Sequence, residues 1–95
     1  DEVIKEFSAR IKKNIRNIDL ACRYGGEEFA IIMPDTSQEL AGIVAERIRA
    51  NIEKHPFIAA NGSKQLPITV SIGVSCVSAD DGYAEKILKR ADVAL

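Results

Sequence analysis

Residues 18–33 read IDLACRYGGEEFAIIM, and this stretch decides the fold of the chain. Two apolar runs flank the pair Gly25 and Gly26. Short apolar runs joined by glycines predict two antiparallel strands connected by a tight turn. Glu27 and Glu28 follow the glycines directly, so two carboxylates stand at this turn.

The composition of the turn indicates a ligand site. Residues without side chains let a ligand approach the backbone closely. Carboxylate oxygens bind hard divalent cations, which in turn bind phosphates. The pattern therefore predicts a nucleotide–metal site, and the alternative is a surface turn with two solvated carboxylates. Successive side chains of a strand point to opposite faces, so Glu27 and Glu28 cannot face one ligand equally.

Two helices are predicted around this hairpin. Apolar residues recur at helical spacing over residues 3–15, which indicates an amphipathic helix ending near Asn17. A second helix is expected after Thr36, whose hydroxyl stands three residues before Glu39 in a capping-box pattern. Pro56 prevents this helix from continuing.

The remaining residues predict a second hairpin and a last helix. Segments 57–60 and 66–77 flank Asn61-Gly62, a dipeptide typical of hairpin turns. The second of these segments alternates as a long strand, and a further helix is expected after residue 80. The order of elements predicts an α+β domain with a central, mainly antiparallel sheet flanked by helices.

Size and composition exclude several classes of function. The 95 residues suffice for one small domain, and a net charge of −1 favours neither a nucleic-acid nor a membrane partner. No apolar stretch approaches the roughly 20 residues of a membrane span. Cys22 and Cys76 lie in strand-like runs without metal-ligand spacing, so we expect two reduced, partly buried thiols and a cytoplasmic location.

Two residues before the hairpin form a second candidate site. Arg16 can make a planar, bidentate contact with a phosphate or a guanine edge. Asp19 can accept hydrogen bonds from the ring N–H and the amino group of guanine. The alternative is an ordinary surface ion pair. Arg47 stands on the exposed face of the second helix, where a solvated charge is the simplest interpretation, and His55 is best interpreted as a turn residue.

Residues 16–29, RNIDLACRYGGEEF, resemble the signature of GGDEF domains, the diguanylate cyclases, in the variant with two glutamates. The resemblance is to the cyclases of the response-regulator type. The resemblance covers essentially the whole chain and implies a nucleotidyl-cyclase or palm-like fold. Further matches to the family occur in the expected order over residues 31–36 (IIMPDT), 45–49 (AERIR), 69–74 (TVSIGV) and 88–95 (LKRADVAL).

The resemblance implies condensation of two GTP into cyclic di-GMP with release of pyrophosphate, in bacterial signal transduction. Each site holds one GTP, so a homodimer is implied, and the parent protein should carry a sensory or receiver domain. Gly25 and Gly26 would lie beside the nucleotide. Glu27 would ligate Mg²⁺ or Mn²⁺ and accept the proton of the ribose 3′-hydroxyl, with Glu28 supporting the metal site. Asp1 would recognise guanine, the alternative being a helix N-cap.

The resemblance also implies product inhibition. Arg16 and Asp19, with five residues between Asp19 and Gly25, match the RxxD site at which the family binds cyclic di-GMP. Arg47 matches a further arginine that helps to close the inhibited dimer. Lys12 and Lys13 have no implied role.

The family's first strand and the end of its last helix have no counterpart in residues 1–95, so we expect a fragment of a GGDEF domain. These residues alone should not make cyclic di-GMP, and steady turnover of GTP by the chain would contradict this. The alternative function is a catalytically inactive module that senses cyclic di-GMP or GTP. A third interpretation, a purely structural α+β domain, requires the signature to be accidental.

Overall fold

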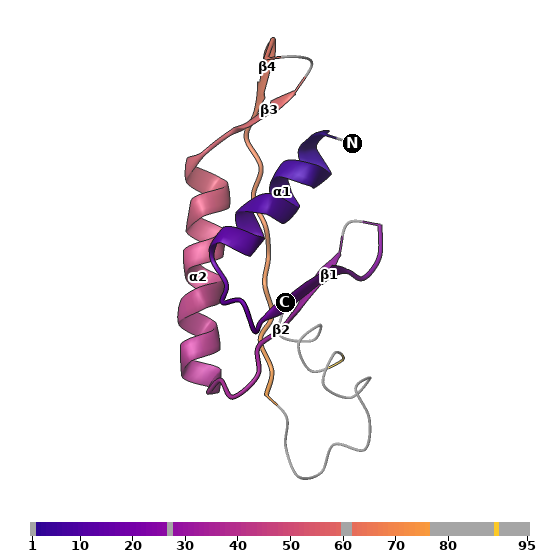
Figure 1. Cartoon of the computed structure of the whole chain (residues 1–95). Coiled ribbons are helices and arrows are strands. Elements are labelled where there is room, and N and C mark those ends of the chain that lie inside the picture. The colour runs from indigo at the N-terminus through magenta and orange to yellow at the C-terminus, as the bar shows by residue number, and fades with distance from the viewer. Residues whose placement is uncertain (1, 27, 60–61, 77–88, 90–95) are drawn as a thin grey trace.

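The computed structural model describes residues 2–26, 28–59, 62–76 and 89, and it confirms the α+β class (Figure 1). No helix in this described part has the length and apolar character needed to cross a membrane. The elements follow the order α1 (Glu2–Lys13), β1 (Leu20–Arg23), β2 (Phe29–Ile32), α2 (Gln38–Lys54), β3 (Phe57–Ala59) and β4 (Lys64–Leu66).

Both predicted hairpins are present, and all strand pairing among the described residues is antiparallel. In the first, Leu20 lies opposite Ile32 at the open end and Arg23 opposite Phe29 beside the turn. The second pairs β3 with β4, and Gly62 in its turn adopts a φ of 88°, which side chains rarely tolerate. The described strands thus form two separate two-stranded sheets.

The prediction of a long strand over residues 66–77 is wrong for the described part of this segment, because only Leu66 lies in a strand. β4 ends at Leu66, and no strand pairing joins residues 67–76 to any other described segment. An extended segment becomes a strand only through a hydrogen-bonded neighbour, so alternation of side chains alone was insufficient. Ile68 and Val70 nevertheless pack against the core, as the alternation predicts. The helix predicted after residue 80 lies outside the described residues, Lys89 excepted.

The first helix ends earlier than its apolar pattern predicts. α1 stops at Lys13 instead of near Asn17 because Asn14 closes its last turn. The Asn14 backbone N–H donates to the Ile11 carbonyl at 3.0 Å, and its side-chain amide donates to the Arg10 carbonyl at 2.8 Å. These bonds satisfy carbonyls that a helix end leaves without partners.

The N-cap of α2 corrects the sequence prediction by one residue. Ser37, not Thr36, is the cap: its hydroxyl accepts a hydrogen bond from the Leu40 backbone N–H at 3.1 Å. The Thr36 hydroxyl instead accepts from Arg16 and donates to the Pro34 carbonyl. At the other end, His55 is the C-cap before Pro56, so the helix ends where the proline predicts.

The core lies between the two helices and the start of β3. Ile11 from α1, three residues of α2 and Phe57 are buried, and β1, β2 and the 68–70 segment pack around them. The Phe7 ring lies 4.9 Å from Phe29 and 6.3 Å from Phe57, so it joins the two hairpins to one aromatic cluster.

Neither cysteine forms a disulfide. Cys76 is partly buried as expected, whereas Cys22 on β1 is exposed.

Arg10 fastens α1 to the end of α2. Its guanidinium lies 4.0 Å from the centre of the Phe57 ring and donates to the backbone carbonyls of His55 and Pro56. It also pairs with Glu6 one turn earlier on α1. A cation held over an aromatic ring and by carbonyls of a neighbouring element ties the two elements together.

Substitution of one buried and one exposed isoleucine tests the packing of this core. Ile52 is fully buried, whereas Ile58 in the neighbouring strand is 51% exposed. Ile52→Ala should lower the free energy of unfolding by about 2–5 kcal/mol, because it leaves a cavity in the packed core. Ile58→Ala, the matched control, should change it by less than about 1 kcal/mol. Urea unfolding measures both, and equal effects would contradict the described packing.

Candidate functional site

The β1–β2 hairpin carries a candidate site at each end. Gly25, Gly26 and Glu28 form the closed end, and Arg16 and Asp19 lie at the open end, where the chain enters β1. Four cross-strand pairs separate the two ends, roughly 10 Å along the strands. One short ladder therefore connects the two sets of residues that the sequence singles out.

The turn is closed by two backbone hydrogen bonds. The N–H groups of Tyr24 and Gly25 donate to the Glu28 carbonyl at 2.8 and 3.2 Å. Neither glycine has a left-handed φ, so the backbone conformation does not itself require glycine. Among the described residues other than its chain neighbours, none has an atom within 4 Å of a Cβ added to Gly26. A Cβ added to Gly25 would meet a Glu28 carboxylate oxygen at 3.6 Å.

Of the predicted catalytic and metal-binding carboxylates, the structure describes Glu28 alone. Its side chain reaches back over Gly25, and the residue is exposed to solvent. Glu27 and Asp1 lie outside the described residues. Within the described part of the chain, no group of three histidine, cysteine or carboxylate side chains could hold a metal ion. A cation at this turn would therefore need ligands beyond those described, such as phosphate oxygens of a nucleotide.

Arg23 is a residue of the turn that sequence reasoning missed. Its guanidinium donates to the Gly26 carbonyl at 2.6 Å and to the Gly25 carbonyl at 3.2 Å. Each glycine carbonyl thus accepts a hydrogen bond from the Arg23 side chain, which holds the turn from the β1 side. The position of an arginine two residues before the glycine pair is the one signal that could have indicated this contact.

At the open end, Arg16 and Asp19 form a close ion pair. Arg16 Nη2 lies 2.8 Å from Asp19 Oδ1, and Arg16 Nε lies 3.2 Å from both carboxylate oxygens. The Arg16 backbone N–H also donates to Asp19 Oδ2 at 2.8 Å, and the Asp19 N–H donates to the Arg16 carbonyl at 3.0 Å. The Asp19 side chain is fully buried, whereas that of Arg16 is 43% exposed. The pair is thus more than a solvated surface contact.

Both members of the pair are charged at neutral pH. The hydrogen bond from the Arg16 guanidinium holds the pKa of Asp19 below its ordinary value, although burial acts in the opposite direction. The same bond to Asp19 raises the pKa of Arg16. The buried carboxylate is therefore compensated by a cation that still faces solvent.

Two further groups hold Arg16, and sequence reasoning did not find them. Arg16 Nη2 donates to the Pro34 carbonyl at 2.8 Å and to the Thr36 hydroxyl at 2.6 Å. Both acceptors belong to the connection between β2 and α2. The guanidinium thus joins the entry of β1 to the exit of β2.

Arg47 is tethered instead of freely solvated. Its guanidinium donates to the backbone carbonyl of Asn14, just beyond the end of α1. Residues 14–19, the corner that connects α1 to β1, begin at this contact. No hydrogen bond joins Arg47 to Arg16 or Asp19. Arg49, by contrast, pairs with glutamates of its own helix, so of these two arginines it is Arg47 that reaches beyond α2.

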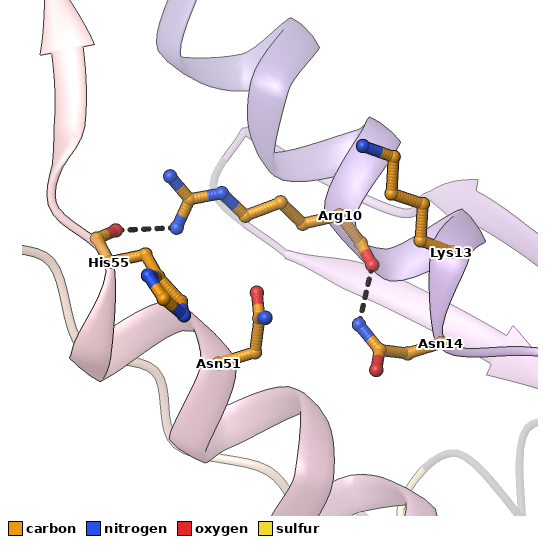
Figure 2. A pocket seen from close by; sticks show the side chains of 5 residues that line it. All are labelled: Arg10, Lys13, Asn14, Asn51 and His55. Atoms are coloured by element: carbon orange, nitrogen blue, oxygen red, sulfur yellow. Dashed lines mark hydrogen bonds between the residues drawn. The ribbon is translucent and has the colours of Figure 1, made fainter.

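A cavity of about 330 Å³ lies between the C-terminal parts of the two helices (Figure 2). Both helices end beside it, and the C-terminal end of a helix dipole favours cations. The basic side chains of the cavity thus stabilise the C-terminal ends of the helices. The helix dipoles disfavour an anionic ligand at the same place. The lining residues are Arg10, Lys13, Asn14, Asn51 and His55.

Comparison with known proteins establishes the family. The family model "Diguanylate cyclase, GGDEF domain" matches residues 1–95. The chain therefore belongs to the GGDEF family.

Individual relatives agree with this assignment. The chain is 51% identical over 92 residues to the response regulator PleD of Caulobacter vibrioides, covering 97% of this chain and 20% of PleD. It is 43% identical over 95 residues to diguanylate cyclase A of Treponema denticola, covering all of this chain and 25% of that protein. The chain thus spans a quarter or less of the length of these relatives.

A solved structure has the same fold. It is the crystal structure of the diguanylate cyclase SiaD of Pseudomonas aeruginosa in complex with its activator SiaC. The TM-score is 0.83 at 33% identity, and the match covers 97% of this chain and 34% of that one.

The stabilisation by Asp19 should depend on pH. Because its pKa is lowered in the folded state, its contribution is complete at neutral pH and is lost as the pH falls from about 4 through the lowered value. Asp19→Asn should therefore destabilise the chain at pH 7, and its difference from the wild type should shrink below pH 4. Urea unfolding at several pH values measures this difference. A difference that does not vary with pH would contradict the charged pair.

Proposed function

We propose that the domain containing this chain is a diguanylate cyclase that condenses two GTP into cyclic di-GMP. The observation that carries the proposal is the Gly25–Gly26 turn, with the Glu28 carboxylate beside Gly25, in a member of the GGDEF family. In this reaction the 3′-hydroxyl oxygen of each GTP attacks the α-phosphorus of the other. Pyrophosphate leaves, and the hydroxyl proton passes to a base, the role proposed for Glu27.

A divalent cation, Mg²⁺ or Mn²⁺, fits the donors of this turn. Glu27 and Glu28 would supply carboxylate oxygens, the ligands that hard cations prefer. When bound, the cation would neutralise phosphate charge and lower the pKa of a coordinated hydroxyl. The protein's own task is then to position the nucleotide over Gly26, with Asp1 accepting hydrogen bonds from guanine.

The proposed reaction needs two domains and is regulated. Each site binds one GTP, so two copies must meet as a homodimer for the two nucleotides to react. Relatives include a response regulator and a cyclase crystallised with its activator, which supports a sensory or receiver domain in the parent protein.

Product inhibition is proposed for the corner at the other end of the hairpin. Arg16 offers an exposed guanidinium held in place by a buried carboxylate, which suits a phosphate or guanine edge of cyclic di-GMP. The guanidinium of Arg47, a residue of α2, contacts Asn14 beyond the end of α1 and could contact such a ligand as well. A second candidate function is therefore a module that senses cyclic di-GMP without catalysis. The residues of this corner could bind the ligand even if the carboxylates at the turn did not support a reaction.

Substitution of the proposed base tests the catalytic role. In the full-length parent protein, Glu27→Gln should lower cyclic di-GMP synthesis by at least about a hundredfold, because the glutamine cannot accept the proton. Product formation from GTP is followed by chromatography. Circular dichroism should show an unchanged fold, and wild-type activity in this variant would contradict the proposal.

Substitution of Arg16 tests the product site. Isothermal titration calorimetry of the 95-residue chain with cyclic di-GMP should show binding that Arg16→Ala abolishes. Arg49→Ala is the matched control, since Arg49 is also a partly exposed arginine paired with a carboxylate. Binding that survives Arg16→Ala would contradict the assignment. Binding in the chain together with an inactive parent protein would favour the sensing module.

A further inference from the structure

Thr36 has a place in the structure that helix capping does not explain. Ser37 caps α2, so the helix does not need the Thr36 hydroxyl. That hydroxyl instead donates to the Pro34 carbonyl at 2.9 Å and accepts from Arg16 Nη2 at 2.6 Å. One hydroxyl thus connects the guanidinium of the proposed product site to the end of β2.

The local backbone brings these acceptors together. Asp35, between Pro34 and Thr36, has a φ of 49°, a left-handed conformation that aspartate tolerates better than most residues. The chain reverses locally, so the carbonyl before Asp35 and the hydroxyl after it both reach Arg16 Nη2.

The contacts leave one side of the guanidinium free for a ligand. Nε and Nη2 face Asp19, Pro34 and Thr36, whereas no hydrogen bond joins Nη1 to any residue that the structure describes. The side chain is 43% exposed. A planar guanidinium fixed along one edge presents its remaining donors and its flat face in a defined direction.

We propose that Thr36 is a positioning residue of the product site, because its hydroxyl holds the Arg16 guanidinium in the orientation that receives cyclic di-GMP. This inference rests on the proposed product-binding function. A long side chain that is already held loses less conformational freedom on binding, so holding Arg16 increases affinity without a contact between Thr36 and the ligand.

Three variants of the 95-residue chain test the proposal by calorimetry with cyclic di-GMP. Thr36→Val removes the hydroxyl and keeps the shape, and it should weaken binding roughly three- to tenfold. Thr36→Ser keeps the hydroxyl and should bind within about twofold of the wild type. Thr69→Val removes an exposed hydroxyl far along the chain and should bind like the wild type. Equal affinity of Thr36→Val and the wild type would overturn the proposal.

A second measurement needs no ligand and separates this proposal from the product site itself. The Arg16 Nη2–H signal in ¹⁵N-resolved NMR spectra, from the group that donates to the Thr36 hydroxyl, should be slow to exchange with water in the wild type and in Thr36→Ser. It should exchange at least several-fold faster in Thr36→Val, and an unchanged rate would overturn the positioning role. If the wild type fails to bind cyclic di-GMP, the proposed product site is wrong. The exchange rates still decide whether Thr36 holds Arg16.

Discussion

The hydrogen-bonded pair of Arg16 with the buried carboxylate of Asp19 is the constraint on which the arrangement around the hairpin depends. A fully buried carboxylate is unfavourable without a partner, so the chain between α1 and β1 must present Arg16 to it. The same guanidinium then reaches Pro34 and Thr36 and fixes the exit of β2. Strand entry, strand exit and the exposed donors of Arg16 are therefore determined together.

This constraint holds a candidate site at one end of a hairpin that carries another at its turn. The open end is held by side-chain hydrogen bonds around Arg16, and the closed end is held by backbone bonds to the Glu28 carbonyl. Four cross-strand pairs lie between them, so the two strands that begin and end at the corner also present the Gly25–Gly26 turn. The catalytic and the inhibitory proposals thus concern one hairpin instead of two unrelated surfaces.

Local patterns predicted much of the fold and part of the site. Alternation and glycines located both hairpins, and Pro56 located the end of α2, because these signals act within a few residues. The strand over residues 66–77 was overestimated, since strand formation depends on a partner that alternation does not reveal. Thr36 and Arg23 were missed because their hydrogen bonds join backbone oxygens and side chains whose positions only the folded chain defines.

The most direct test of the central claim is a titration of the ¹⁵N-labelled chain with cyclic di-GMP, followed by the backbone amide signals. Ligand binding at the corner should shift the amides of Arg16, Asp19 and Thr36 first and saturate with one affinity. Shifts confined to residues distant from this corner, or no shifts at all, would contradict the assignment of Arg16 and Asp19 as the product-binding site.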